Sequence, residues 1–192
     1  MKTVKAKNID DSHVMTGEVR LLYSSLEQGQ QQPEETGKTV YQACLLIPKT
    51  DTETISLMED LILRTAKQQW GEKINPKKFL HYPLRDGDQE REGALFNGVF
   101  FMNVKTYRPP LLLNVDNTRA EAGLLYSGCY GRAALSAYSY DRNGNKGVSI
   151  SIDAFQFLRD GEPAGSSLDT EALISAFGAV KTDESTDENP FG

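Results

Sequence analysis

Residues 124–159 read LLYSGCYGRAALSAYSYDRNGNKGVSISIDAFQFLR, and this stretch decides the fold of the 192-residue chain. It predicts two β-strands joined by a hairpin. Asn143-Gly144 supplies the turn, because this pair accepts the positive φ angles of a tight turn and stands between two runs of alternating residues.

Successive side chains of a strand point to opposite faces of a sheet, so the parity of the sequence assigns each residue to a face. In the first strand, the face suited to a core carries Ala133, Leu135, Ala137 and Ser139, and the other face carries Tyr130, Arg132, Ala134, Ser136, Tyr138 and Tyr140. In the second strand, Val148, Ile150 and Ile152 share one face, and Ser149, Ser151 and Asp153 share the other. The hairpin therefore has an apolar face and a polar face that bears tyrosines.

The same alternation predicts strands over residues 14–23, 39–48 and 96–108. Parity places Met15, Val19, Leu21 and Tyr23 on one face of the first of these strands. Between the second and third, Thr50-Asp51-Thr52-Glu53 has the spacing of a capping box, and apolar residues at helical spacing follow as far as Trp70-Gly71. Five antiparallel strands with one inserted helix predict an all-β chain with the five-stranded barrel of an OB-fold, which commonly binds oligonucleotides on one side of its sheet.

Charge is distributed unevenly along the chain. The net charge is −6, but residues 160–192 hold eight acids and one base, whereas the preceding 159 residues hold 19 acids and 20 bases. We therefore expect one OB-fold domain over residues 1–165 and a flexible acidic tail over residues 166–192. The tail ends in DESTDENPFG, and we expect its acids and its terminal ring to modulate DNA access and to recruit protein partners: Asp183, Glu184, Asp187, Glu188 and Phe191.

Several classes of protein are excluded by the sequence. Its apolar runs fall short of the roughly 18 residues needed to cross a bilayer, and the polar N-terminus lacks the apolar core of a secretory signal, so we expect a cytoplasmic protein with no membrane partner. Cys44 and Cys129 are interpreted as buried thiols of a reducing compartment. With His13 and His81 they lack the short spacing of zinc ligands, and we expect no metal and no cofactor.

Aromatic and basic residues share the faces that point away from the predicted core. One such face carries Phe101, Lys105, Tyr107 and Arg108, and the opening hairpin adds Tyr130, Arg132, Tyr138, Tyr140 and Lys146. Single-stranded DNA needs planar groups on which unpaired bases stack and cations along its backbone, so these nine residues are the predicted DNA-binding site. The alternative is that the rings cover a second small core, because tyrosine is common in strands.

Two other functions are left open by the sequence. Asp86, Asp88 and Glu90 could hold Mg²⁺ in a nuclease, although acids beside a glycine are usually turn residues and a second acidic motif with a nearby lysine is missing. A structural or adaptor protein whose barrel binds protein alone is the other alternative. We expect a binding protein and not an enzyme.

Four ordered blocks of the chain resemble a known family. They are TVYQACLLIPKTDTETI (39–55), PLRDGDQERE (83–92), FFMNVKTYRPP (100–110) and the segment from LLYSGCYGR to FLRDGEP (124–163). They resemble bacteriophage single-stranded-DNA-binding proteins, over roughly residues 14–165. The resemblance implies an OB-fold, the coating of single-stranded DNA in phage replication or recombination in the host cytoplasm, and replication or recombination proteins as partners of the tail. It leaves self-association on DNA open.

Overall fold

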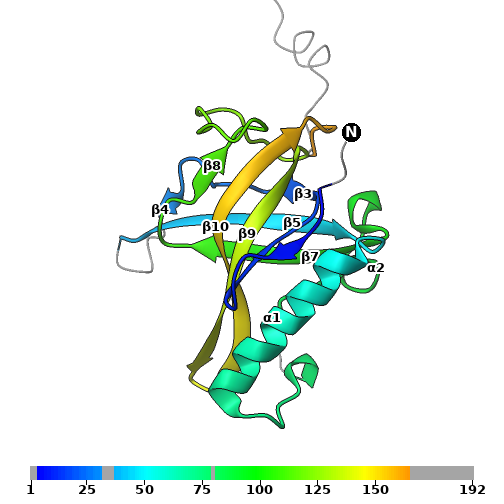
Figure 1. The fold of residues 1–192 in the computed structure, drawn as a ribbon, viewed down its shortest axis with the longest axis vertical. Helices are drawn as coiled ribbons and strands as arrows, with labels where there is room; N and C mark the ends of the chain where they lie inside the picture. The colour runs from blue at the N-terminus through cyan, green and yellow to red at the C-terminus, as the bar shows by residue number, and fades with distance from the viewer. Residues whose placement is uncertain (1–3, 32–36, 79–80, 165–192) are drawn as a thin grey trace, which may run out of the picture.

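Five strands close into a barrel in the computed structural model, which describes residues 4–31, 37–78 and 81–164 (Figure 1). They are β3 (Val19–Leu22), β5 (Thr39–Pro48), β7 (Val99–Thr106), β9 (Tyr130–Arg142) and β10 (Asn145–Arg159). Hydrogen bonds run in the order β9-β3-β5-β7-β10, and the β9–β10 hairpin closes the ring. The predicted OB-fold barrel is confirmed.

One pairing of the barrel differs from the prediction of five antiparallel strands. β7 and β10 pair in parallel, with Val104 beside Ile150. An odd number of strands cannot alternate in direction all the way around a closed ring, so at least one neighbouring pair must be parallel. The remaining four pairings of the ring are antiparallel.

Shorter elements extend the barrel. The additional strands are β1 (Lys7–Asn8), β2 (His13–Met15), β4 (Gln30–Gln31), β6 (Arg85–Asp86) and β8 (Leu111–Leu113). The helical elements are the long helix α1 (Thr52–Trp70), the single turn α2 (Gly87–Glu90) and the 3-10 turns η1 (Pro76–Lys78) and η2 (Ala94–Phe96). None of the described helices is long and apolar enough to cross a membrane.

The strand predicted over residues 14–23 is divided into β2 and β3. Its break lies at Gly17, whose N–H donates to Thr54 Oγ1 at 2.8 Å and where an added Cβ would lie 2.5 Å from the Asp51 carboxylate. The backbone thus lies directly against the Asp51 and Thr54 side chains at the start of α1, and a side chain at position 17 would displace the Asp51 carboxylate. At the other end of β3, Tyr23 has a φ of 49°, which breaks the alternation and leaves Tyr23 64% exposed instead of in the core.

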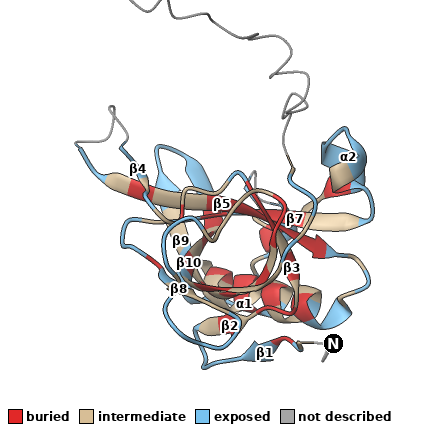
Figure 2. Cartoon of the chain, turned by 90° about the horizontal axis from the view of Figure 1, so that it is seen from above, coloured by how far each residue is buried: buried red, intermediate tan, exposed pale blue. Residues whose placement is uncertain are grey.

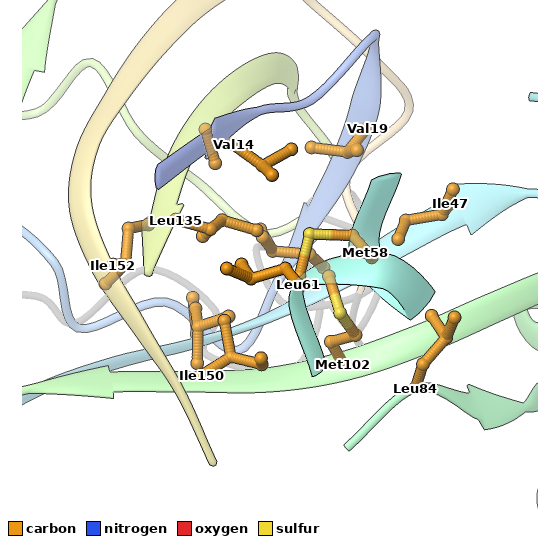
Figure 3. Close-up of a cluster of buried hydrophobic side chains, with 14 of the residues drawn as sticks. Val14, Val19, Ile47, Met58, Leu61, Leu84, Met102, Leu135, Ile150 and Ile152 are labelled. Atoms are coloured by element: carbon orange, nitrogen blue, oxygen red, sulfur yellow. The ribbon is translucent and has the colours of Figure 1, made fainter. Parts of the chain in front are cut away.

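Helix α1 covers one opening of the barrel (Figures 1 and 2). Its N-cap is Asp51, whose carboxylate accepts the N–H of Thr54, one residue later than the predicted capping box. Met58 and Leu61 point from the helix into the barrel interior (Figure 3). The helix ends at Gly71, as predicted, with a φ of 88° that favours glycine.

The core lies inside the ring, and Figure 2 shows buried residues in the strands around it. Leu135, Ile150 and Ile152 belong to this core, as the parity of the hairpin predicted. A second, smaller cluster lies on the outer side of β5 and β7: Leu22, Cys44, Leu46, Phe96 and Phe101. Residues 85–98 therefore cover the part of the outer face around Phe101, where Phe96, Arg85 and Arg91 contact its ring.

Candidate nucleic-acid interface

A hollow of about 630 Å³ lies over the outer faces of β7, β9 and β10. Its walls combine rings, cations and hydroxyl groups: Lys105, Thr106, Tyr107, Arg108, Tyr138, Tyr140, Arg142, Ser149, Ser151 and Asp153. Five of the nine residues predicted to bind DNA are among them: Lys105, Tyr107, Arg108, Tyr138 and Tyr140. The fold thus brings together the two predicted aromatic–basic segments, which are separated in the sequence by the residues between Arg108 and Tyr130.

Two further hollows adjoin this one. One, of about 430 Å³, extends across β7 and β5 to Tyr23, and the other, of about 640 Å³, extends to His81 and Tyr82. Ser149 lines all three hollows. We refer to the three together as the groove.

The register of the sheet shows that the groove crosses the strands. Tyr138 of β9 pairs with Ser149 of β10, and Asn103 of β7 pairs with Cys44 of β5. β10 and β7 pair in parallel through Ile150 and Val104, which each follow the paired residue Ser149 or Asn103 by one position. The two pairs therefore lie in one row across the sheet. Neighbouring strands lie about 4.8 Å apart, so a ligand along this row would pass over four strands and end near Tyr23.

The tyrosines of the groove present ring surface to solvent. The exposed fractions are 64% for Tyr23, 47% for Tyr107 and 38% for Tyr138, and Tyr140 is half-buried. Burial, with a smaller effect of nearby Tyr138, raises the pKa of Tyr140 above its usual value. The Tyr140 hydroxyl group therefore stays neutral at physiological pH and does not repel phosphate.

The cations of the groove are exposed and come from different elements. Lys105 lies near the end of β7, Arg108 follows that strand, and Arg142 ends β9. Within residues 4–31, 37–78 and 81–164, none of the three forms an ion pair. Lys38 adds a charge on the rim, with its Nζ 5.8 Å from the centre of the Tyr107 ring. This arrangement suits an anionic chain with unpaired planar groups.

The predicted exposure of Phe101 is wrong. The side chain is fully buried and packs edge-on against Phe96, with a ring-centre distance of 5.5 Å. Parity assigned Phe101 correctly to the outer face of β7, but residues 85–98 cover that part of the face. For this one ring, the alternative of a second small core is the one that the structure supports.

Three other predicted residues lie outside the groove lining. Tyr130 is at the opposite end of β9 from Tyr138, between the guanidinium groups of Arg20 and Arg159 at 5.6 and 3.6 Å from its ring centre. Arg132 donates to Gln156 Oε1 at 2.7 Å. Lys146 lies at the hairpin tip, 3.3 Å from the Asp141 carboxylate. The predicted tail residues lie outside the described part of the chain: Asp183, Glu184, Asp187, Glu188 and Phe191.

Several groove residues were missed by the sequence reasoning. Arg142 shares the parity of Tyr138 and Tyr140 and could have been found from it. Ser149, Ser151 and Asp153 were assigned to the polar face of the hairpin but were not counted as site residues. No sequence pattern places Tyr23 in the groove. Its positive φ turns the side chain away from the core, and alternation does not reveal a positive φ.

The acids considered for a nuclease are bound to cations. Lys49 Nζ lies 2.6 Å from Asp86 Oδ1 and 2.7 Å from Asp88 Oδ2, and Arg85 Nη2 lies 2.6 Å from Glu90 Oε2. The N–H of Gly98 also donates to Asp88 at 2.9 Å. These contacts hold residues 85–98 over Phe101, so the LRDGD segment has a structural role. In the described part of the chain, no three acids, histidines or cysteines are grouped to hold a metal ion.

The chain matches known phage proteins in sequence. The family model described as the ssDNA-binding protein of Enterobacter phage Enc34 matches residues 12–188. Protein p50 of Acyrthosiphon pisum secondary endosymbiont phage 1 is 36% identical over 138 residues, which cover 66% of this chain and 72% of p50.

Solved structures share the fold. The single-stranded DNA-binding protein of bacteriophage Enc34 in complex with ssDNA has a TM-score of 0.68 at 22% identity, covering 85% of this chain and 99% of that one. The single-stranded DNA-binding protein gp2.5 of bacteriophage T7 has a TM-score of 0.55 at 9% identity, covering 82% and 97%. With the barrel and the match of the family model over residues 12–188, these findings show that the chain belongs to the Enc34 family of phage single-stranded-DNA-binding proteins, a family of binding proteins and not of enzymes.

Proposed function

We propose that this protein binds single-stranded DNA with little sequence preference and coats it during phage DNA replication or recombination in the host cytoplasm. Bases would stack on the tyrosines of the groove, and Lys105, Arg108 and Arg142 would neutralise phosphates. Membership of the Enc34 family supports the ligand, and a relative of the same fold has been solved with ssDNA.

One observation carries the proposal: exposed rings and exposed cations line the same hollow. Stacking on an aromatic ring contributes about 1–3 kcal/mol per base and needs the face of an unpaired base, which a duplex does not offer. Phosphate neutralisation alone would bind both forms of DNA. The rings of Tyr107 and Tyr138 therefore favour the single-stranded form.

The experiment compares single- and double-stranded oligonucleotides of one sequence by fluorescence anisotropy between about 50 and 200 mM salt. We expect tighter binding of the single strand at every salt concentration. Equal affinity for both forms, or no binding of either, would overturn the proposal. Incubation of labelled oligonucleotide with Mg²⁺ in parallel should leave the strand intact.

We also propose that the acidic tail modulates access to the groove and recruits replication or recombination proteins. Its composition supports both roles, because an anionic segment can imitate phosphates and Phe191 can occupy a partner's pocket. Deletion of residues 183–192 should tighten DNA binding and weaken the recruitment of partners. Weaker DNA binding after the deletion would contradict the first role.

We further propose that copies of the protein associate with one another along DNA. Measurement of affinity against oligonucleotide length tests this proposal.

A further inference from the structure

We propose that Asp153 contacts the edge of a base in the groove and favours bases that carry an exocyclic amino group over thymine. The inference rests on the proposed function and refines it, since it adds a modest preference at one subsite of an otherwise sequence-tolerant groove. It is based on three features of the Asp153 side chain: its position, its charge and its one hydrogen bond among the described residues.

The backbone at Asp153 is a β-bulge. Ile152 pairs with Leu135 and Ala154 pairs with Ala134, so Asp153 is an extra residue on β10 with no partner on β9. Bulges redirect a side chain at the cost of a local break in the ladder. Here the bulge changes the parity of β10 after Asp153, so that Phe155 lies in the core. The Asp153 carboxylate itself stays on the side of Ser149 and Ser151, is exposed, and lines the same hollow as Tyr107 and Tyr138.

The charge of Asp153 is opposite to that of the other ionised groups in this hollow, which are Lys105, Arg108 and Arg142. A carboxylate repels phosphate, so it opposes the electrostatic attraction that these cations provide. In the described part of the chain, Asp153 forms no ion pair that would cancel its charge. A carboxylate in this place is favourable only where it faces a hydrogen-bond donor, and the bases are the part of the strand that supplies donors.

The carboxylate is oriented by one contact. Ser136 Oγ donates to Asp153 Oδ2 at 2.9 Å, and Ser136 lies two residues before Tyr138, on the same face of β9. This bond uses one acceptor position and leaves Oδ1 with no bond among the described residues. A base stacked on a neighbouring tyrosine would present its edge to this oxygen.

The chemistry of the base edges sets the direction of the preference. The N4 amino group of cytosine and the N6 amino group of adenine donate hydrogen bonds, and carboxylates accept from the cytosine amino group in known complexes. Thymine presents the O4 acceptor at the same position, so two acceptors would face each other without a proton between them. Stacking does not make this distinction, because every base has a π-face.

The test uses two oligomers that differ only at this edge, oligo(5-methyldeoxycytidine) and oligothymidine, each of about 12 nucleotides, which lies within the range of one OB-fold. Both carry the methyl group, so the comparison isolates the amino group from the carbonyl group. We expect the wild-type protein to bind the 5-methylcytosine oligomer roughly fivefold more tightly, which corresponds to about 1 kcal/mol, the net contribution of one hydrogen bond. In Asp153→Asn the two affinities should become equal, because an amide both donates and accepts.

Two variants control for charge and for orientation. Asp141→Asn removes one negative charge from the same hairpin outside the groove lining, and it should keep the fivefold ratio. Ser136→Ala keeps the charge of Asp153 but removes its positioning bond, and it should reduce the ratio without a uniform gain in affinity.

Three results would overturn the inference: equal binding of the two oligomers by the wild type, a ratio that survives in Asp153→Asn, or a ratio that is lost equally in Asp141→Asn. Failure of the wild type to bind either oligomer would overturn the proposed function itself. The two failures are therefore distinguishable.

Discussion

The guanidinium group of Arg159 lies 3.6 Å from the centre of the Tyr130 ring. Arg20 contacts the same ring at 5.6 Å and donates to the carbonyl oxygen of Glu162 at 2.6 Å. Arg20 therefore links the ring of Tyr130 to the segment that follows β10. Tyr130 and Tyr138 share a strand and a face, yet only Tyr138 lines the groove.

This difference gives a matched pair of substitutions. Tyr138→Ala should weaken binding of single-stranded DNA by about 1–3 kcal/mol and change stability little, because the loss is one stacking surface that is partly exposed. Tyr107→Ala should behave in the same way. Tyr130→Ala should instead lower the free energy of unfolding by about 1–2 kcal/mol through loss of its cation–π contacts and leave binding nearly unchanged. Anisotropy titration and urea unfolding measure the two effects, and a reversed pattern would contradict the assignment.

The cations of the groove should determine the salt dependence of binding. Lys105→Gln is expected to reduce the slope of log K against log[salt] by about 0.7, the contribution of one phosphate contact in a single strand. Lys146→Gln is the control, because Lys146 is paired with Asp141 at the hairpin tip and does not line the groove. An equal loss of slope in both variants would show that the phosphate path extends to the tip.

Phe101 should affect stability and not base stacking. Phe101→Ala is expected to lower the free energy of unfolding by about 3–5 kcal/mol, because the ring is fully buried beside Phe96 and truncation leaves a cavity. Affinity for DNA, measured where the variant is fully folded, should fall much less than in Tyr138→Ala. A loss of affinity with unchanged stability would mean that Phe101 is accessible to bases.

The ion pairs of Lys49 predict an acid-sensitive segment. The hydrogen bond from Lys49, followed by that from the Gly98 N–H, lowers the pKa of the Asp88 carboxyl below its ordinary value of 3.8. A group with a lowered folded pKa stabilises the protein fully above the unfolded pKa and loses that contribution as the pH falls through the folded pKa. Asp88→Asn should therefore be less stable than wild type near pH 7, and the difference should shrink below about pH 3.8.

Urea unfolding midpoints at several pH values measure this effect. Glu92→Gln, which removes an exposed carboxylate from the same segment, serves as the control and should be as stable as wild type near pH 7. A deficit of Asp88→Asn that stays constant down to about pH 3 would contradict the role of this ion pair.

The thiol of Cys44 should be unreactive although it lines the groove. Only 5% of the residue is exposed, and burial raises the pKa of the thiol to about 11, against a smaller opposing effect of Arg91 and Arg85. The nucleophilic thiolate is therefore scarce near neutral pH. Reaction with a thiol reagent at about pH 8 should be slow in the native protein and fast in urea. A fast native reaction at Cys44, identified by mass spectrometry, would show that the floor of the groove opens.

Alternation and helical spacing are local consequences of backbone geometry, so they predicted the barrel strands, the long helix and the apolar face of the hairpin without any tertiary contact. Parity also placed Lys105, Tyr107, Tyr138 and Tyr140 on outward faces correctly. Local patterns carry this information because each of these residues lies in a regular strand or directly after one.

Only the tertiary structure decided which outward residues share a surface. Phe101 is covered because Lys49 holds residues 85–98 over it, Tyr130 is held by Arg20 and Arg159, and Tyr23 is exposed by a positive φ that parity does not register. Phe155 lies in the core because of the bulge at Asp153, which appears only when two strands are paired. Each of these outcomes depends on contacts between residues far apart in the sequence, and a local pattern contains no record of such contacts.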